Sequence, residues 1–364
     1  MIVKEVITIL EELAPLTYAE DFDNVGLLVG DEKNEVSGIL VTLDTLEVVV
    51  DEAISHSCNL IVSFHPIIFE GLKKLTGSTY VERVVIKALQ NNIAIYSMHT
   101  ALDNCKEGVN AKICEVLGIE NPEILIPQKN TIKKLTTYVP KSDAQKLLHS
   151  LFESGAGNIG NYSNCSFTND GTGSYRPEEN AKPVKGKIGA LHFEEEIQIH
   201  ITYPRSKEAS ILKALFKTHP YEEVAYELYS LENTNQHVGM GMIGNLPEPI
   251  DELQFLKNIK KTMNASCIRH SNLRDKPVQK IAVLGGSGAF AISAAKAADA
   301  DVLITADIKY HQFYEAEDQI LIADIGHYET EQFTKNLLVD YLTKKIPNFA
   351  LRLSESKTNP IKYL

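Results

Sequence analysis

Three histidine–carboxylate pairs, each with a spacing of four residues, are the part of this sequence best suited to chemistry. They are His99 with Asp103, Asp307 with His311, and His327 with Glu331. Imidazole nitrogen and carboxylate oxygen are ligands that zinc, manganese and iron accept. On a helix, a spacing of four places both side chains on one face, close enough to share an ion. One such pair is common on surface helices, but three pairs beside apolar, strand-like runs favour a metal site.

A further histidine, His65, precedes Pro66 directly after an apolar run. Proline fixes the next backbone dihedral, so this ring is suited to pointing into a cleft. The alternative is a loop histidine bonded to a backbone carbonyl. For Glu331, which opens an expected helix, the alternative is a charge that only interacts with the helix dipole. The metal interpretation needs further ligands from elsewhere in the chain, and Asp103 and His327 supply them.

The elements expected around these residues alternate between strand and helix. In the first third, strands are expected at 39–43, 59–64 and 93–98, and helices at 45–57, 79–91 and 108–117. In the last third, strands are expected at 280–285, 301–305 and 319–326, and helices at 288–298 and 328–345. Such alternation indicates βαβ units and a mostly parallel sheet. His65, His99, Asp307 and His327 all follow strand ends, where open α/β sheets bind ligands.

The middle of the chain has a different order of elements. It reads as a strand at 131–139, a helix at 142–153, a polar glycine-rich loop within 157–183, strands at 187–193 (KIGALHF) and 196–203, a helix at 206–217 and a strand at 224–231. The order β-α-β-β-α-β is the ferredoxin-like pattern. We therefore predict that 129–238 is an inserted α+β domain, which divides one α/β domain into segments 1–128 and 239–364. The 157–183 loop is too long for a simple connection, which predicts disorder or a function.

Two shorter motifs have both a structural and a functional interpretation. Gly285, Gly286 and Gly288 lie between an expected strand and helix, where backbone N–H groups could cradle a phosphate of a bound cofactor. Turn geometry alone is the alternative, because the full dinucleotide-binding spacing and the P-loop lysine are absent. His219-Pro220-Tyr221-Glu222-Glu223 is either a turn with a packed tyrosine or a set of ionisable groups at a ligand cleft. We favour the turn.

Composition restricts the class of protein. The 364 residues are 44% hydrophobic and 23% charged, as in a soluble globular protein of two or three domains. The net charge of −12 and the lack of a long basic run argue against nucleic acid as a partner. Five scattered cysteines without a CxxC argue against a disulfide framework and favour a reducing compartment. No signal peptide or apolar run of ~18 residues is present, so a cytoplasmic location without membrane contact is expected.

Six motifs give the chain a specific resemblance. They are FDNVGLLVG (22–30), HPIIFEGLKKL (65–75), SMHTALDN (97–104), LGGSG (284–288), ITADIKYH (304–311) and GHYETEQF (326–333). In this order they resemble the signatures of the Nif-three-like dinuclear metal-centre family, often labelled GTP cyclohydrolase 1 type 2 homologues. The middle, with THPYEEVAYELY (218–229), resembles the CutA-like (PII-like) domain inserted in many bacterial members.

The resemblance implies two divalent ions per chain, held at His65, Asp103, His327 and Glu331. Zinc is the first expectation, with manganese or iron as alternatives, and a carboxylate can bridge both ions. Many members have His-His-Pro where this chain has Phe64-His65-Pro66, which leaves one ion short of a protein ligand. Water, His99 or His311 are the available replacements. The resemblance also implies a toroidal homohexamer whose metal sites face an internal cavity.

Two classes of function follow. The first is a metal-dependent hydrolase acting on a nucleotide-like substrate, by GTP ring opening or by phosphoester hydrolysis. Its acid–base group would be His99, or His311 held by Asp307. The second is a noncatalytic metal- or ligand-binding regulator or adaptor, in which the middle domain senses a small molecule. A dedicated guanine reader or a basic triphosphate clamp would distinguish the classes, and neither is visible in the sequence.

Overall fold

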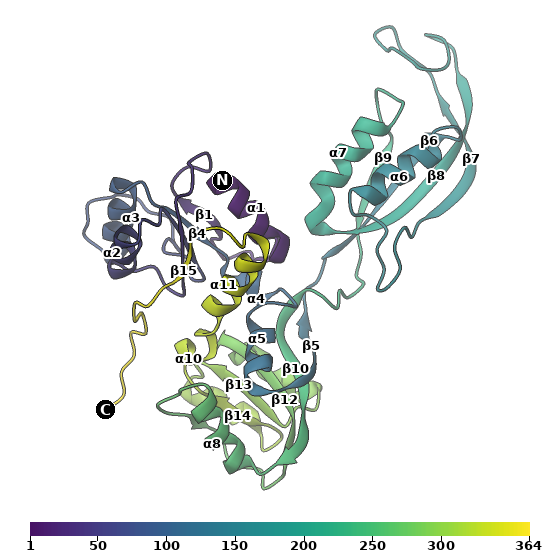
Figure 1. Cartoon of the computed structure of the whole chain (residues 1–364). Coiled ribbons are helices and arrows are strands. Elements are labelled where there is room, and N and C mark those ends of the chain that lie inside the picture. Colours follow the sequence, from purple (N-terminus) through teal and green to yellow (C-terminus); the bar gives the residue numbers. More distant parts are fainter. The chain divides into compact units, whose positions relative to one another are not determined.

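The computed structural model describes residues 1–364, which form two compact units (Figure 1). Unit 1 consists of Met1–Gln128 and Gln236–Leu364, and unit 2 consists of Lys129–Asn235. Unit 2 ends slightly before the predicted boundary at 238, because the backbone of 237–238 hydrogen-bonds to unit 1. This arrangement confirms the predicted fold class, an α/β unit built from two sequence segments and interrupted by an α+β unit.

The first segment of unit 1 contributes most of a five-stranded sheet. Its elements are α1 (Val3–Leu13), β1 (Gly26–Val29), β2 (Ile39–Thr42), α2 (Glu47–Ser55), β3 (Leu60–Ser63), α3 (Tyr80–Gln90), β4 (Ala94–Ser97), α4 (His99–Asp103), α5 (Val109–Leu117) and β5 (Glu120–Pro127). The strand order is β1-β4-β3-β2-β15, and only β1 is antiparallel to its neighbour. Strand β15 (Leu351–Leu353) comes from the far end of the chain.

The second segment contributes most of a six-stranded sheet. Its elements are β10 (Gly239–Ile250), α8 (Glu252–Thr262), β11 (Arg269–His270), β12 (Val278–Ser287), α9 (Ile292–Ala297), β13 (Val302–Ala306), η4 (Tyr310–Ala316), β14 (Leu321–Asp324), α10 (His327–Glu331) and α11 (Thr334–Lys345). The strand order is β11-β14-β13-β12-β10-β5, with parallel pairing only among β12, β13 and β14. In this sheet the predicted parallel pairing is therefore confined to three strands, and both sheets of unit 1 are mixed.

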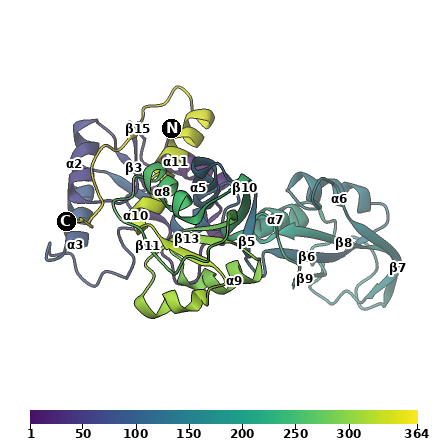
Figure 2. The ribbon, with the colours of Figure 1, turned by 90° about the horizontal axis from the view of Figure 1, so that it is seen from below.

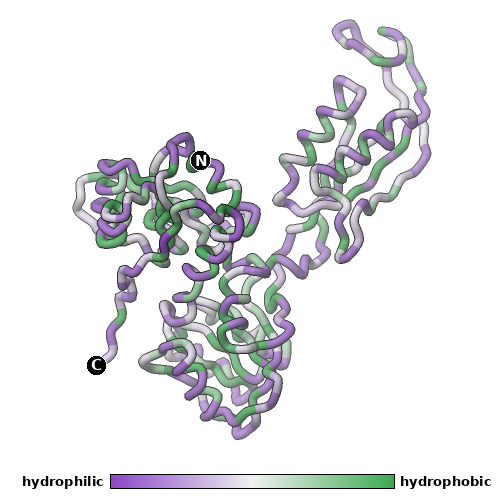
Figure 3. Tube along the Cα trace, viewed as in Figure 1, coloured by the Kyte–Doolittle hydropathy of each residue, from purple (hydrophilic) through white to green (hydrophobic).

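One hydrophobic core joins the two sheets of unit 1. It includes Val41 and Val62 of the first sheet and Val283 and Ile304 of the second, all essentially inaccessible to solvent. The opposite faces of both sheets are covered as well, the first by α2 and α3 and the second by α9 and η4. Strands buried on both faces read as continuous apolar runs, which explains why they were recognisable in the sequence. Figure 3 shows these strands among the most hydrophobic segments of the chain.

Unit 2 has a four-stranded antiparallel sheet of order β7-β8-β6-β9. Its elements are β6 (Ile132–Pro140), α6 (Ala144–Glu153), β7 (Phe167–Tyr175), β8 (His192–Pro204), α7 (Glu208–Thr218) and β9 (Tyr226–Ser230). Element order and strand order are those of the ferredoxin-like fold. Helices α6 and α7 cover one face of the sheet (Figure 2), where they share a core with β6 and β8.

Three expectations for single elements were wrong. Residues 187–191 of KIGALHF are not a strand, because Gly189 (φ +76°) adopts a left-handed conformation that a strand excludes; only His192 and Phe193 belong to a strand, β8. On the side away from β6, β8 pairs instead with β7, which lies inside the polar segment that was expected to be a loop. Backbone pairing along the whole of β7 replaces the apolar side chains that normally signal a strand. The helix expected over 328–345 is divided into α10 and α11.

Two further expectations concerned disulfide bonds and membrane-spanning helices. All five cysteines are free, three of them buried. No helix of the structure is both long enough and apolar enough to cross a bilayer.

Candidate metal centre

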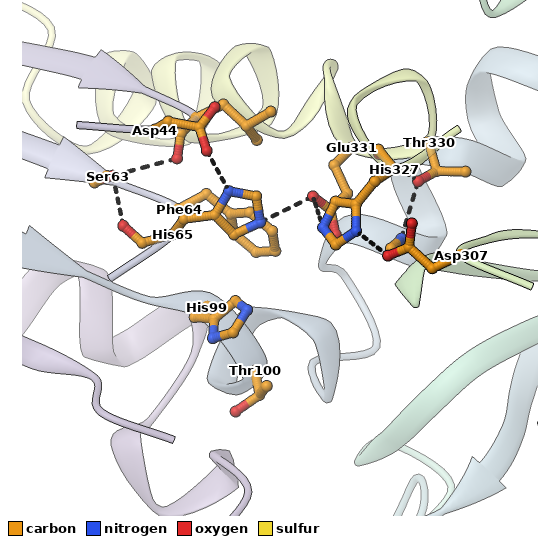
Figure 4. A network of polar contacts seen from close by, with 12 residues as sticks. Asp44, Ser63, Phe64, His65, His99, Thr100, Asp307, His327, Thr330 and Glu331 are labelled. Atoms are coloured by element: carbon orange, nitrogen blue, oxygen red, sulfur yellow. Dashed lines mark hydrogen bonds and ion pairs between the residues drawn. The ribbon is translucent and has the colours of Figure 1, made fainter. Parts of the chain in front are cut away.

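Strand ends of both sheets deliver the candidate ligands to one place in unit 1. His65 follows β3 of the first sheet, and His327 opens α10 directly after β14 of the second. Glu331 ends α10 and is 3% exposed. Figure 4 shows the rings of His65 and His327 on either side of the Glu331 carboxylate. One nitrogen of each ring and one oxygen of Glu331 lie within 4.8 Å of one another, as a shared ion requires.

Each of three histidine rings is oriented by an aspartate at its Nδ1. His65 Nδ1 lies 2.8 Å from Asp44 Oδ1, and His327 Nδ1 lies 2.7 Å from Asp307 Oδ2. The ring of His99 is held in the same way, with Nδ1 2.8 Å from Asp23 Oδ1. Because a carboxylate accepts, each ring donates its Nδ1–H, and Nε2 is left for another partner. Metal-binding histidines are oriented in this manner.

The two free ring nitrogens of His65 and His327 converge on a single oxygen. Nε2 of His65 lies 3.0 Å from Oε2 of Glu331, and Nε2 of His327 lies 3.2 Å from the same atom. This oxygen is nevertheless buried without a hydrogen-bond partner. If both rings were neutral, each Nε2 atom would direct a lone pair at the negatively charged Glu331 carboxylate, and the contact would be repulsive. The contact is favourable only when a positive charge, either protons or a cation, is present between them.

The titration of these groups reflects the same need for positive charge. Burial alone would lower the pKa of His65, but Asp44 and Glu331 raise it to about 10. Burial likewise opposes the charged form of His327, but Glu331 and Asp307 raise its pKa to about 9. Burial would raise the pKa of Glu331, yet the two histidines lower it to about 2. These shifts favour the forms in which the two histidines are protonated and Glu331 is ionised.

Asp103, the fourth predicted ligand, has no partner for one of its oxygens. It lies at the end of α4, and its Oδ1 is buried without a hydrogen bond. Burial, together with the charge of Glu331, raises its pKa well above the usual range. A buried carboxylate without a partner is costly, and coordination of a cation is one way to satisfy it. The donor set of His65, His327, Glu331 and Asp103 therefore fits divalent ions.

A cavity of about 250 Å³ adjoins three of these four candidate ligands, and His65 does not line it. Its polar lining includes His99, Asp103, His327 and Glu331, so the structure brings these four predicted residues together. Phe64, where a ligand was expected to be missing, is fully buried, and its ring contacts those of His65 and His99. It offers no ligand atom to the site.

The expected pairing of Asp307 with His311 was wrong. Asp307 has a left-handed backbone (φ 57°), and the next helix, η4, begins only at Tyr310. The two residues therefore do not share a helix face, and Asp307 binds His327 instead. His311 is exposed beside Tyr310 and Tyr314 and does not line the cavity.

A similar correction applies to His99 and Asp103. Both belong to α4 and both line the cavity, but the carboxylate that binds the ring of His99 is Asp23. Of the three spaced pairs, only His327 and Glu331 contact each other directly.

The backbone amides of the glycine motif are occupied within the protein. Gly285 N–H donates to Asn110 Oδ1, and Gly286 N–H donates to Thr330 Oγ1, each over 2.9 Å. Gly288 N–H donates to a backbone carbonyl of β13. The expected phosphate cradle therefore has no free donors at these three positions. Gly286 (φ +67°) has another role, because a Cβ there would lie 2.4 Å from Glu331 Oε1.

The orienting aspartates Asp23 and Asp44 were not identified from the sequence. Asp23 lies within the FDNVG motif, and Asp44 directly follows the run that forms β2. A carboxylate immediately after a strand end is a usable signal. Its histidine partner, however, lies 76 positions away for Asp23 and 21 for Asp44, and no local spacing predicts such pairs.

Comparisons with known proteins agree with the resemblance noted in the sequence. The profile of the family described as Duf34/NIF3 (NGG1p interacting factor 3) matches residues 1–360. A Bacillus subtilis protein named GTP cyclohydrolase 1 type 2 homolog is 35% identical over 99% of this chain and 98% of its own length. The crystal structure of a Bacillus cereus protein related to NIF3 has a TM-score of 0.86 at 35% identity, covering 100% of this chain and 99% of that one. A Staphylococcus aureus protein of 29% identity has a TM-score of 0.79, with coverage of 100% and 99%.

Proposed function

Because the chain belongs to the Duf34/NIF3 family, we propose that unit 1 is a divalent-metal-dependent hydrolase acting on a planar nitrogen heterocycle, such as the purine of a nucleotide. One observation carries the metal part of the proposal. The Nε2 atoms of His65 and His327 both meet Oε2 of Glu331, which is buried and has no hydrogen bond. The Nδ1 atom of each of these rings contacts an aspartate. This arrangement needs positive charge between its members. A divalent cation would supply it, and zinc accepts nitrogen and oxygen donors of this kind.

Two ions per chain fit the available donors. His65, His327 and Glu331 would hold the first ion, and Glu331 with the unpartnered Asp103 would hold the second. Phe64 leaves the second ion with fewer protein ligands, so it should bind more weakly than the first. Manganese or iron are the alternatives to zinc, because both accept the same donors. The chemistry that bound divalent ions supply is Lewis-acid activation of water at neutral pH.

His99 is the group suited to move a proton during the reaction. It lines the cavity beside Asp103, and its ring is fixed by the contact between Nδ1 and Asp23. Thr100 donates two hydrogen bonds to the second oxygen of Asp23, so the aspartate itself is held in place. The fixed ring keeps Nε2 for the substrate, as a general acid or base requires. Asp307 serves in orienting His327, and His311 has no role in this proposal.

The cavity lining supports a flat, uncharged group as the part of the substrate that enters. Phe22 and Phe290 both line the cavity and remain 68% and 55% exposed. Exposed aromatic rings at a cavity offer faces on which a heterocycle can stack. No lysine or arginine lines the cavity, so a triphosphate would have to remain outside it. Hydrolysis of a purine ring requires that the base of the nucleotide enters the cavity. Phosphoester hydrolysis requires instead that the phosphate enters it.

The test is an activity comparison with zinc- or manganese-loaded full-length protein. Two activities are measured in parallel. GTP ring opening is detected as a loss of purine absorbance, and phosphoester hydrolysis is measured with bis-p-nitrophenyl phosphate. The proposal expects GTP turnover that falls at least 100-fold in His99→Gln and at least tenfold in Phe290→Ala. Phe216→Ala, which removes a comparably exposed ring from unit 2, should leave turnover unchanged. Equal rates in all four proteins would indicate a contaminating enzyme and refute the hydrolase.

The second candidate is a noncatalytic metal- or ligand-binding regulator. The absence of cationic side chains in the cavity favours it, because the site has no means of its own to bind phosphates. Under this alternative the protein binds metal but turns over neither substrate. The toroidal homohexamer also remains a prediction, and sedimentation equilibrium of the purified protein would measure the number of subunits.

A further inference from the structure

Unit 2 contains a second and larger cavity, of about 500 Å³, formed entirely by its own residues. Small organic ligands occupy cavities of about 300–1,000 Å³. The cavity is bounded by β6, β7 and β8, by the segment 177–184, and by the turn at 221–225 that follows α7. The candidate metal centre uses none of these residues, so a ligand of this cavity would be separate from that centre.

Two glycines of β7 leave the floor of this cavity open. In β8, Ile199, Ile201 and Tyr203 pack in the core that α6 and α7 share. The alternate residue Glu196 therefore points to the opposite side of the sheet. Its direct cross-strand partner is Gly171, where an added Cβ would meet nothing within 4 Å. Gly173, two residues further along the same face, lies beneath the Glu196 carboxylate, and a Cβ there would collide with it at 2.1 Å.

Glu196 is the buried charged group of the cavity. The residue is 9% exposed, and its Oε1 accepts a hydrogen bond of 2.8 Å from the hydroxyl of Tyr221. The ring of Tyr221 in turn contacts the ring of Tyr175 edge to face, with centroids 5.7 Å apart. Both rings line the cavity. The Glu196 carboxylate and two aromatic rings therefore line the same cavity.

The His219-Pro220-Tyr221-Glu222-Glu223 motif, for which we favoured a turn over a set of ionisable groups at a ligand cleft, builds one wall of this cavity. His219 is structural, since its Nε2 bonds to the carbonyl of Tyr138 and its Nδ1 accepts from the backbone N–H of Tyr221. With both nitrogens occupied, the histidine fixes the turn that presents Tyr221 to Glu196. Glu222 accepts a bond from the backbone N–H of Lys182, which joins this wall to the opposite one.

The charges of the lining determine which ligands the cavity admits. Its titratable side chains, apart from three tyrosines, are Asp170, Lys182, Glu196, Glu222 and Glu223. Asp170 is neutralised by Lys141 on the exposed surface. The remaining carboxylates outnumber the one lysine, so the cavity repels phosphates and carboxylates. Tyrosine faces attract cations, and the interaction strengthens when water is excluded.

We propose that this cavity is a binding site for a small organic cation with an aromatic or apolar body, such as an aryl-substituted amine. The ammonium group binds Glu196, and the body of the ligand lies over Gly171 and against the rings of Tyr175 and Tyr221. The site does not depend on the proposed hydrolase, and it gives unit 2 a ligand chemistry distinct from that of the metal centre.

The test uses isothermal titration of full-length protein with tryptamine. Indole-3-acetate, which has a similar ring but the opposite charge, is the matched ligand. Tryptamine should bind at least tenfold more tightly than indole-3-acetate. Glu196→Gln should weaken tryptamine binding at least tenfold, or about 1.4 kcal/mol. Glu195→Gln, which removes the same charge from the exposed neighbouring residue, should bind as the wild type does.

Gly171→Val tests the place of the ligand without changing any charge. Valine is favoured in strands, so the variant should fold with an unchanged unfolding temperature while its side chain fills the open floor. It should no longer bind tryptamine. The proposal is overturned if wild-type protein does not bind tryptamine, if indole-3-acetate binds equally well, or if the Glu195 and Glu196 variants lose affinity equally. Unchanged binding by folded Gly171→Val would also overturn it.

Discussion

The variant Gly286→Ala tests whether this glycine supports the metal centre or only contributes to the stability of the fold. The added methyl group would lie 2.4 Å from Glu331 Oε1 and 3.3 Å from the His327 ring, so the carboxylate must move. Gly118→Ala is the matched control, because Gly118 has the same φ of +67° and an open space at its Cβ position. In each variant, forcing alanine into the left-handed conformation should reduce the free energy of unfolding by about 1–2 kcal/mol.

Only Gly286→Ala should also lose metal affinity. Displacing a group that positions a ligand typically lowers affinity by about 10–100-fold, and here the ligand itself is displaced. Zinc affinity is measured by competition with a chromophoric chelator, and the free energy of unfolding is measured in urea on the metal-free protein. Equal zinc affinity of the two variants, with both folded, would refute the assignment of Glu331 as a ligand supported by this glycine.

Three further predictions concern single side chains. Asp44→Asn should lower zinc affinity about 10–100-fold by chelator competition, because the ring of His65 loses the carboxylate that orients it; unchanged affinity would exclude that role. Phe64→His places an imidazole beside the site, so titration calorimetry should show a second zinc ion binding more tightly than in the wild type. Burial raises the pKa of Glu52, but hydrogen bonds from the serines and backbone of 354–356 outweigh this and lower it. Its stabilising effect is therefore present above a pH of about 4.5 and is lost as the pH falls through the lowered value. Glu52→Gln should accordingly weaken protection of 354–356 from hydrogen exchange at pH 7 and reduce its dependence on acidity, and identical exchange in both proteins would contradict this.

The sequence was sufficient to predict that His65, His327 and Glu331 would lie together, because the physical signals were local. Buried central strands produce unbroken apolar runs, and His65 and His327 directly follow two of them. The pair His327 and Glu331 has helical spacing within α10 and forms as predicted. Both signals depend only on residues a few positions apart.

Features that depend on tertiary pairing were not predictable in this way. The ring of His99 bonds to Asp23 and not to Asp103, and Asp23 lies 76 positions away in the sequence. Strand β7 has almost no apolar pattern, and it forms because β8 offers a complete row of backbone partners. The cavity of unit 2 arises from the lack of side chains at Gly171 and Gly173, which only the register with β8 places next to Glu196.

The most direct test of the metal centre is the zinc content of Glu331→Gln. Glu329→Gln is the control, because Glu329 is buried in the same helix and its carboxylate bonds to Asn359 rather than to the site. After saturation with zinc and desalting, elemental analysis of the wild type and of Glu329→Gln should give between one and two ions per chain. Glu331→Gln should give less than about a tenth of that amount while keeping the circular dichroism spectrum of the wild type. Full zinc occupancy in folded Glu331→Gln would contradict the account.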